Sequence, residues 1–352
     1  MGKAKPFFIF MTCMVVLVFA SETYRGPLLP GYAPLKAVLM ANPITGPASD
    51  DPDRQPLYIA LSVLWEGEHL EPHNLRAIRD FRRKFSSIPL IHFINPAYFA
   101  RDPGARKVNR AKINSIIRAG DETGLHLVPW KSLVRGAGLK FKGSPTFWGY
   151  QLPASWCRQD CGKEVLLSAY GPDQIRSLLN HHMDLMQEHG FGRPRVLHAA
   201  GWMATPGVLE GIAAAGLRYD LSGVTPATFR RRLQWYPLYQ KMESIWQDQA
   251  FRAPGIVDTR QGSVIQVSHI SALADYLSAD EILEAWNLLE ADWAANPRRP
   301  LVFHLSFHQE TAMQYLPRVS SALQRIFARA QNSSMAVRVL PLPLNARTLV
   351  MQ

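Results

Sequence analysis

The hydrophobic positions divide the chain into short apolar stretches separated by longer amphipathic ones. The short stretches combine aliphatic, β-branched and aromatic residues over the length of one β-strand, at residues 57–63, 88–94, 124–128, 195–201, 263–269, 300–308 and 337–344. Runs of this length and composition are typical of strands in a sheet that is covered on both faces. The pattern therefore predicts a central sheet.

Between most of these stretches the apolar positions recur with the period of an α-helix. Residues 171–190 show this well, with one apolar stripe made of Ile175, Leu178, Leu179, Leu185 and Met186. Further helices are predicted at 74–85, 108–119, 205–215, 278–295 and 313–331. Strands that alternate with helices predict βα units around a parallel sheet, and hence an α/β fold. The length of 352 residues allows one large barrel or two modest domains.

Polar side chains cluster directly after the predicted strands, in residues 63–68, 92–99, 120–131, 197–204, 268–276 and 304–312. In a parallel barrel the carboxyl ends of the strands form one rim, so we expect these segments to meet there. Alternate side chains of an extended strand share a face, which would point His304, Ser306 and His308 the same way. The Gly- and Pro-rich residues 136–172 predict a long loop over this end of the barrel.

The first residues have the layout of a secretory signal. Lys3 and Lys5 precede a hydrophobic stretch at 7–19, and Val18 and Ala20 would stand at positions −3 and −1 of a cleavage after Ala20. The stretch is short for a bilayer, so we expect no stable transmembrane span once the signal is removed. The protein is thus predicted to be exported, as a periplasmic or secreted protein.

The composition, with 47% hydrophobic and 19% charged residues, excludes a disordered chain. The formal net charge of +11, from 39 Lys and Arg against 28 Asp and Glu, predicts association with an anionic surface. Nucleic acid, acidic lipid and anionic envelope polymer all fit this charge. No recognition helix or RNA-binding signature occurs, and the basic run at 229–235 is typical of a solvated face. Nucleic acid is therefore not expected as a partner.

The three cysteines agree with export. Cys13 would leave with the signal peptide, and Cys157 and Cys161 would remain as an even pair in an oxidising compartment. A local disulfide is the favoured interpretation of this pair. A pair of zinc ligands is less favoured, because no second Cys/His pair with suitable spacing lies nearby.

Several of the polar segments, taken in order, match known motifs. They read "SVLWEGE" (62–68), "HFINPAYF" (92–99), "GDETGLHLVPWK" (120–131), "LHAAGWMA" (197–204), "SALADY" (271–276) and "FHQETA" (307–312). The ordered set resembles the polysaccharide deacetylases of carbohydrate esterase family four, which carry the NodB-homology domain. The resemblance covers about residues 57 to 330. It gives a predicted domain order of signal peptide (1–20), N-terminal arm (21–56) and deacetylase-like barrel domain (57–345).

The resemblance implies a distorted (β/α) barrel of about seven strands. It also implies removal of acetyl groups from glycans with one divalent metal, usually zinc, held by an Asp and two His. In such chemistry the metal polarises the acetyl carbonyl and activates a water, a carboxylate takes the water's proton, and a histidine protonates the leaving amine.

Three of the motifs depart from the family pattern. Leu64 stands where the family has its leading Asp, the expected base. Val128 and Trp130 stand where the second metal histidine would fall, and His198 replaces the Arg that orients the base. Because general acid–base groups contribute about 10²- to 10⁴-fold each, losing the base and a ligand together should remove most of the rate.

Some candidate residues remain. His308 matches the family's general acid, and His126 matches the first metal histidine, although a histidine on an apolar strand can also be a core residue. Glu66, two positions after Leu64 on the same strand face, is a ligand, a base or a surface carboxylate. His304, deeper in its strand, is predicted to be a buried structural group.

Further candidates are expected to contact the substrate or to brace the fold. Trp130, Trp202 and Asp275 are the predicted substrate contacts, since a tryptophan at the rim can stack on a sugar, although tryptophans are mainly core residues. Asp121 and Glu122 are expected to brace the turn before their strand rather than to bind metal.

Two functional hypotheses follow. In the first, the protein acts on or binds N-acetylated envelope glycans, such as peptidoglycan, with lost or much reduced metal-dependent deacetylase activity. In the second, it is an active metal-dependent deacetylase with a site rebuilt from Glu66, His126 and His308, with His198 or His304 replacing lost groups. A serine hydrolase is excluded, because no Gly-x-Ser-x-Gly elbow follows a strand.

Overall fold

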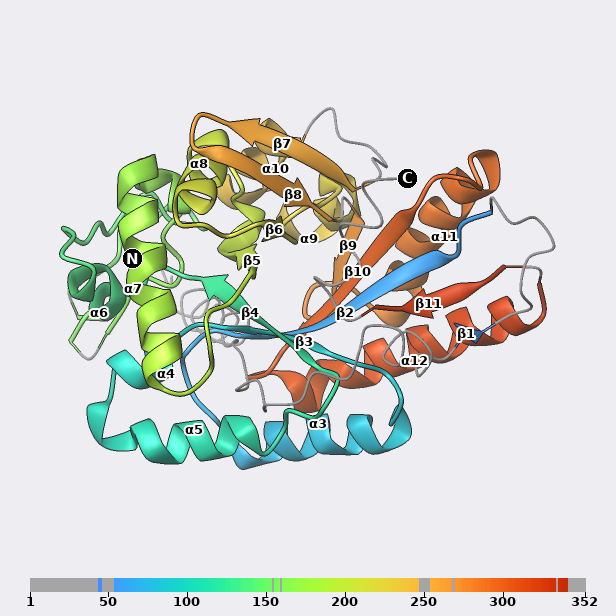
Figure 1. Ribbon diagram of the computed structural model, residues 1–352, viewed down its shortest axis with the longest axis horizontal. Coiled ribbons are helices and arrows are strands. Elements are labelled where there is room, and N and C mark those ends of the chain that lie inside the picture. The colour runs from blue at the N-terminus through green and yellow to red at the C-terminus, as the bar shows by residue number, and fades with distance from the viewer. Residues whose placement is uncertain are drawn as a thin grey trace, which may run out of the picture.

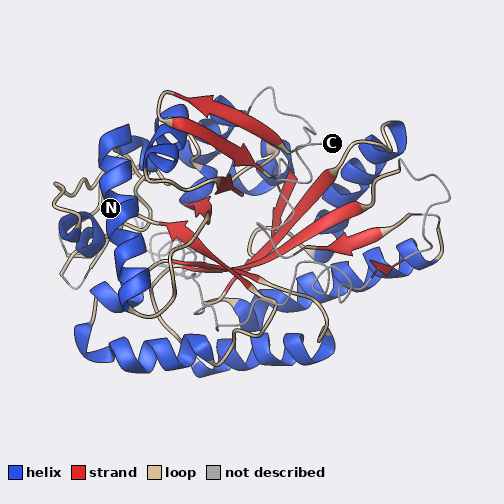
Figure 2. Ribbon diagram, in the orientation of Figure 1, coloured by secondary structure: helices blue, strands red, loops and turns tan. Residues whose placement is uncertain are grey.

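The computed structural model describes residues 44–45, 54–153, 155–158, 160–246, 254–267, 270–333 and 335–340. The predicted signal peptide and most of the predicted arm lie outside the described residues. Within the described part, one curled sheet lies at the centre and helices lie around it (Figures 1 and 2). No helix in this part of the chain is long and apolar enough to cross a membrane.

The sheet has 11 strands. They are β1 (Ile44–Thr45), β2 (Leu57–Trp65), β3 (Ile91–Ile94), β4 (Glu122–Leu127), β5 (Val196–Ala199), β6 (Tyr219–Asp220), β7 (Gly255–Thr259), β8 (Gly262–Gln266), β9 (Ile270–Leu273), β10 (Leu301–His308) and β11 (Val337–Val339). Strands β2 to β6 pair in chain order, β8 follows β6, and β10 lies between β9 and β2, all of them parallel. This order confirms the predicted distorted parallel barrel.

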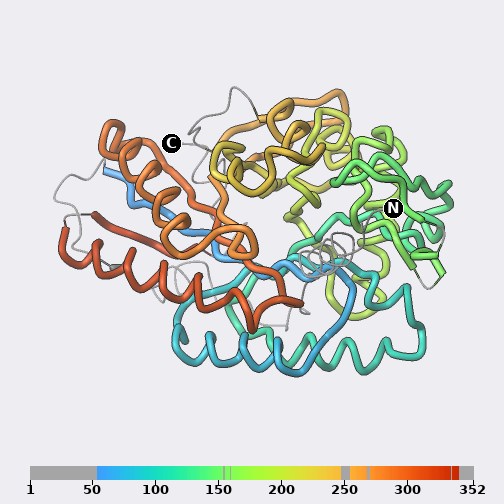
Figure 3. Tube along the Cα trace, turned by 180° about the vertical axis from the view of Figure 1, so that it is seen from behind, coloured from blue at the N-terminus to red at the C-terminus, as the bar shows by residue number. Residues whose placement is uncertain are grey.

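The helices alternate with the strands, as the apolar periodicity predicts. They are α3 (Pro72–Lys84), α4 (Ala97–Ala100), α5 (Arg106–Asn114), α6 (Lys131–Gly136), α7 (Pro172–Glu188), α8 (Pro206–Ala214), α9 (Arg230–Leu233), α10 (Pro237–Trp246), α11 (Ala279–Ala295) and α12 (Ala312–Gln331). The short 3₁₀ turns are η1 (Pro103–Ala105), η2 (Leu167–Ala169), η3 (Ala200–Trp202) and η4 (Pro226–Phe229). Helix α12 packs between α3 and α11, and α7 packs against α8 (Figures 1 and 3).

The helix ends follow local sequence signals. Ser278 accepts a hydrogen bond from the backbone N–H of Glu281, and the Glu281 side chain accepts one from the Ser278 N–H, which starts α11 with a capping box. Thr205 caps α8 in a similar way through Val208 N, and a proline follows at the first position of that helix. These signals determine the residues at which α8 and α11 begin.

Two predicted strands differ from the observed ones. The run at 263–269 contributes β8, which forms an antiparallel hairpin with β7 as well as a parallel pair with β6. The run at 337–344 contributes only β11, and residues 341–344 lie outside the described part. The loop at 136–172 contains the predicted disulfide between Cys157 and Cys161, with an S–S distance of 2.01 Å.

A buried charge cluster surrounds Asp121 at the start of β4. Asp121 receives two 2.9 Å contacts from the guanidinium of Arg82 and one of 3.2 Å from His92 Nε2. The backbone N–H groups of Leu90 and Arg118 also donate to this carboxylate, at 2.9 and 2.8 Å. The prediction that Asp121 braces the turn before its strand is thus confirmed.

His304 lies inside the barrel and is fully buried, as predicted. Its Nε2 is 2.8 Å from Ser62 Oγ on the neighbouring strand β2. Burial lowers the pKa of His304 to about 4. The folded protein therefore keeps this imidazole neutral over a pH range in which an unfolded chain, with a histidine pKa of about 6.5, binds a proton.

This difference makes the contribution of His304 to stability depend on pH. Between about pH 6.5 and 4 only the unfolded chain is protonated at this position, so the free energy of unfolding falls by about 1.4 kcal/mol for each unit of decreasing pH. Glutamine cannot take up the proton. We expect the destabilisation caused by His304→Gln to be about 2 kcal/mol smaller at pH 5 than at pH 7.5.

Urea unfolding of both proteins at the two pH values measures this difference. Ser271→Ala is the matched control, because Ser271 is fully buried opposite His304 in the β9–β10 pair and does not titrate. Its destabilisation should be the same at both pH values. An equal cost of His304→Gln at pH 5 and pH 7.5 would contradict the prediction.

Candidate functional site

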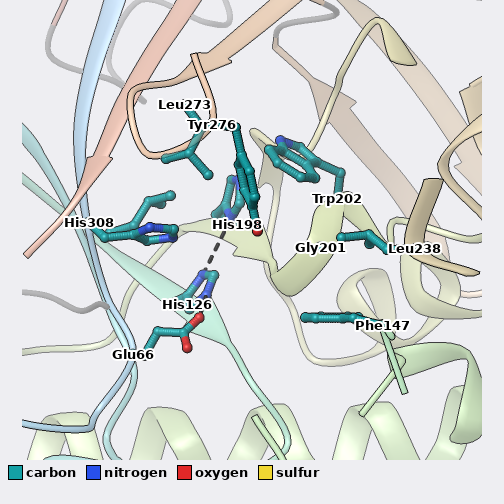
Figure 4. A pocket seen from close by; sticks show the side chains of 11 residues that line it. Glu66, His126, Phe147, His198, Gly201, Trp202, Leu238, Leu273, Tyr276 and His308 are labelled. Carbon is teal, nitrogen blue, oxygen red and sulfur yellow. Dashed lines mark hydrogen bonds and ion pairs between the residues drawn. The ribbon is translucent and has the colours of Figure 1, made fainter. Parts of the chain in front are cut away.

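One small cavity lies at the carboxyl ends of the barrel strands (Figure 4). Its volume is about 30 Å³. It is lined by Leu64, Glu66, His126, Phe147, His198, Gly201, Trp202, Leu238, Leu273, Tyr276 and His308. A space of this size holds about two water molecules. It therefore fits a small group such as an acetyl group, and it is too small for a sugar ring.

The structure brings Glu66, His126 and His308 to this one cavity. Glu66 follows the last residue of β2, and His126 lies near the end of β4. Parallel pairing of β2, β3 and β4 aligns these strand ends, which leaves Glu66 Oε1 at 3.7 Å from His126 Nε2. The proximity was expected from the barrel, and the catalytic and metal-binding roles of the three residues stay predictions.

Glu66 and His126 are both almost fully buried. Burial raises the pKa of Glu66 well above its usual value, against the opposing charge of Lys163. Burial also lowers the pKa of His126 well below its usual value, and the nearby His308 adds to this effect. The site thus favours the uncharged forms of both groups, a carboxylic acid beside a neutral imidazole.

His198 faces His126 from the next strand. The β4–β5 register places the two residues opposite one another, with stacked rings 5.2 Å apart and their Nδ1 atoms 3.3 Å apart. Within the described part of the chain, no hydrogen-bond partner reaches His198 Nε2 or Glu66 Oε2, although both atoms are buried. Buried polar atoms are normally hydrogen-bonded. These two atoms are therefore the natural partners of a polar group that enters the cavity.

His308 is held by a carboxylate behind it. Its Nδ1 lies 2.9 Å from Asp275 Oδ1, and its backbone N–H donates to Asp275 Oδ2 at 3.2 Å. Thr311 Oγ1 donates to the same carboxylate. The Nδ1–Oδ1 contact does not have hydrogen-bond geometry, so the backbone N–H is the group of His308 that donates to Asp275, and the imidazole lines the cavity. An imidazole oriented by a carboxylate is the arrangement used for general acid–base work.

Asp275 was predicted as a substrate contact, and the structure gives it a different position. Its side chain is 2% exposed, and it is not among the residues that line the cavity. Both carboxylate oxygens accept hydrogen bonds or contacts from His308 and Thr311. Its observed contacts are with His308 and Thr311, and its role as a substrate contact stays a prediction.

The two tryptophans predicted as substrate contacts have different surroundings. Trp130 does not line the cavity: its Nε1 donates to the Glu66 carbonyl at 2.5 Å, and the Arg101 guanidinium covers its ring at 4.2 Å. It therefore braces the strand end that carries Glu66. Trp202 does line the cavity, at a positive φ of 57°, and packs on Phe229 with ring centres 4.7 Å apart. A non-glycine residue in this backbone region is held there by its surroundings, which is common at functional sites.

The residues present do not fit a catalytic metal with three protein ligands. Glu66 and His126 offer two donors of the kind that zinc prefers, at a separation that one ion can bridge. Leu64, which lines the same cavity, supplies only hydrocarbon. In the described residues no group of three His, Cys, Asp or Glu side chains could hold a metal ion.

Other cavity residues were not singled out from the sequence. Tyr276 directly follows Asp275 in a motif already quoted, so its position could have been noticed. Burial raises its pKa well above the usual value for a tyrosine. Phe147 and Leu238 come from the long loop and from α10, where no periodic pattern or motif marks them.

Comparison with known proteins gives matches in structure only. No family model and no curated protein sequence matches the chain. A putative polysaccharide deacetylase from Mycobacterium smegmatis aligns over 87% of this chain and 95% of its own, with 15% identity and a TM-score of 0.49. A 4-alpha-glucanotransferase from Thermococcus litoralis aligns over 84% of this chain but 40% of its own, with 10% identity and a TM-score of 0.47.

A family 4 acetyl xylan esterase from Clostridium thermocellum, in complex with a cobalt ion, also aligns. The alignment covers 83% of this chain and 91% of that one, with 11% identity and a TM-score of 0.38. At these values the likeness is one of fold alone.

Proposed function

We propose that the protein is an exported polysaccharide deacetylase-like protein that binds N-acetylated cell-envelope glycans through this cavity, with lost or much reduced metal-dependent deacetylase activity. One observation carries the proposal. A cavity of acetyl size at the barrel rim is lined by Glu66 and by histidines, while the described residues offer no group of three side chains that could hold a metal ion and Leu64 adds only hydrocarbon.

The chemistry of the cavity suits an N-acetyl group. The amide of such a group has one carbonyl acceptor and one N–H donor. A protonated Glu66 can donate to the carbonyl, and neutral imidazoles such as His198 can accept from the N–H. Leu64, Leu273 and Trp202 provide apolar surface for the methyl group. The sugar ring itself stays outside, because the cavity is too small to admit it.

The charge and the predicted signal agree with this setting. A net charge of +11 favours association with anionic envelope polymers such as peptidoglycan. The signal-like residues 1–20 support the proposed export, which would bring the protein to where such polymers occur.

A second candidate function is favoured by the pairing of His308 with Asp275 at 2.9 Å. In this alternative the protein is an active deacetylase in which His308 Nε2 protonates the leaving amine. Glu66, in its ionised form, would take a proton from the attacking water. The carboxylate behind His308 would stabilise the imidazolium that donates this proton.

Metal analysis of the purified protein, combined with binding and acetate-release assays on an N-acetylglucosamine hexamer, tests the proposal. We expect measurable binding of the hexamer, less than stoichiometric zinc, and acetate release no faster than for His126→Ala. Met313→Ala, an exposed position 58% accessible on α12, serves as the control variant.

Two outcomes would overturn this proposal. Stoichiometric zinc together with turnover that His126→Ala abolishes would establish the second candidate function instead. If the protein neither binds the hexamer nor releases acetate, both candidate functions fail.

A further inference from the structure

The wall of the cavity opposite His308 is built from two segments that are distant in sequence. Phe147, in the long loop, and Leu238, in α10, lie together there (Figure 4). The backbone N–H of Leu238 donates to the Phe147 carbonyl at 3.0 Å. Gly201 fits beneath both, since a Cβ at this position would come within 2.9 Å of each side chain. The close contact fixes the position of both segments relative to the cavity.

Further aromatic rings stand on the same two segments, and Trp148 meets Phe147 edge to face with ring centres 6.4 Å apart. Trp148 meets Tyr236 edge to face, with ring centres 4.6 Å apart and an interplanar angle of 85°. Tyr150, two residues further along the loop, meets Trp156 in the same way at 5.6 Å and 84°. Trp235 stands next to Tyr236. These five residues, Trp148, Tyr150, Trp156, Trp235 and Tyr236, are called the aromatic strip below.

Part of the aromatic strip is open to solvent. Trp235 is 82% exposed and Trp156 is 46% exposed. An exposed tryptophan is unusual, because its large apolar surface is otherwise buried on folding. The edge-to-face partners of Trp148 and Trp156 fix the orientation of these rings, so their faces can meet a flat ligand without losing side-chain freedom. Sugar rings have apolar faces of this kind.

The surface beside the aromatic strip is positively charged. Arg231 and Arg232, three or four residues before Trp235, have side chains that are 72% and 51% exposed. Both lie near a single carboxylate, that of Glu281, at 3.6 and 3.4 Å. One negative charge shared between two guanidinium groups leaves a surplus of positive charge. The surface therefore favours a ligand that carries negative groups.

We propose that the aromatic strip binds the neighbouring sugar rings of an anionic glycan chain whose acetyl group enters the cavity. The inference rests on the proposed function and adds to it that the ligand is a polymer, read over several sugar rings, rather than a single acetylated sugar. A membrane surface could also engage tryptophan and arginine. The glycan is favoured because Trp148 of the strip packs edge to face on Phe147, which lines the cavity, and Trp148 in turn meets Tyr236.

Titration with N-acetylglucosamine oligomers of two and six sugars tests the proposal on the full-length protein. We expect the parent to bind the hexamer more tightly than the dimer. Trp235→Ala should weaken hexamer binding by about tenfold and leave dimer binding unchanged, because only the longer chain reaches the strip. Trp235→Phe keeps an aromatic face and should lose no more than about threefold. Leu288→Ala, 49% exposed on α11, is the control for loss of an exposed apolar side chain.

The charge is tested with soluble, uncrosslinked peptidoglycan strands, which carry carboxylates, as the probe. Arg231→Gln with Arg232→Gln should weaken binding of these strands at low salt and leave binding of the neutral hexamer unchanged. Thermal unfolding of each variant checks that it is folded. Trp156→Ala provides a second substitution in the strip, with an effect on the hexamer in the same direction.

The outcomes distinguish failure of the aromatic strip from failure of the proposed function. If the parent binds the hexamer but Trp235→Ala and Trp156→Ala bind it equally well, the aromatic strip has no part in binding and the proposed function stands. If the parent binds neither oligomer, the proposed function fails and the inference fails with it. If Trp235→Ala instead abolishes binding to phosphatidylglycerol vesicles and leaves the hexamer unaffected, the strip is a membrane contact and the inference is overturned.

Discussion

Replacing Asp121 with alanine should lower the free energy of unfolding by about 3–5 kcal/mol. The reason is the number of buried groups that this carboxylate satisfies. Arg82 contacts it through two nitrogens and is itself 3% exposed in its side chain. Without Asp121 the guanidinium charge would remain buried and uncompensated. His92 and the backbone N–H groups of Leu90 and Arg118 would also lose the carboxylate as a hydrogen-bond partner.

The loss of unfolding free energy in Asp121→Ala should become smaller at low pH. Burial by itself raises the pKa of Asp121, but the hydrogen bond and charge of His92, together with Arg82, bring it below its usual value. The carboxylate therefore stabilises the fold fully above its unfolded pKa of about 4, and this contribution is lost as the pH falls through the lowered value in the folded protein. The difference between parent and Asp121→Ala should accordingly narrow below about pH 4.

Urea unfolding at pH 7 measures the effect. Asp280→Ala is the matched control, because Asp280 pairs with Arg325 at 2.5 Å but its side chain is 77% exposed. An exposed ion pair of this kind contributes less than about 1 kcal/mol. A cost of Asp121→Ala no larger than that of Asp280→Ala would show that the buried cluster around Asp121 does not stabilise the fold more than an exposed ion pair does.

Much of the barrel follows from local signals in the sequence. Strands β2 and β10 are long apolar runs. Helices α7, α11 and α12 are long amphipathic segments with clear ends. The positions of these five elements are therefore set by residues close to one another in sequence. The remaining strands are different. Strand β6 has two residues, Tyr219 and Asp220, which is too short for an alternating or apolar pattern to be detected. Its pairing with β5 and β8 depends on tertiary packing.

For the candidate site, the sequence predicted which strand ends meet but not which side chains beyond them face the cavity. The barrel brings the ends of β2, β4 and β10 together, which is why Glu66, His126 and His308 were expected near one another. Which direction a residue just beyond a strand faces is decided by the loop that follows. Trp130 and Asp275 stand in the loops after β4 and β9 and do not line the cavity: Arg101 covers the Trp130 ring, and Asp275 contacts His308.

The second large effect that we expect concerns the metal. Leu64→Asp should raise the affinity of the protein for zinc by at least about 100-fold, because even partners that only support a metal ligand change affinity by 10- to 100-fold. Leu64 is 1% exposed and lines the same cavity as Glu66 and His126. A carboxylate at this position would complete the three donors that a catalytic zinc site requires.

The substitution should be costly when no metal is bound. An unpaired carboxylate in place of a buried leucine is expected to lower the free energy of unfolding by about 3–5 kcal/mol. Zinc at about 100 times its dissociation constant should restore about 2.7 kcal/mol of this loss, since a ligand that binds only the folded state stabilises it by mass action. For a chain of this length that corresponds to a rise in melting temperature of roughly 5 °C.

Thermal unfolding with and without zinc, together with calorimetric titration of the metal, measures both effects. Leu64→Asn is the matched control, because asparagine has nearly the same shape and polarity as aspartate but lacks the negative charge that zinc prefers. We expect its melting temperature and that of the parent to change little on addition of zinc. If zinc stabilises Leu64→Asp no more than Leu64→Asn, then position 64, Glu66 and His126 cannot bind one ion together. The absence of a carboxylate at position 64 would then not explain why Glu66 and His126 fail to form a catalytic metal site.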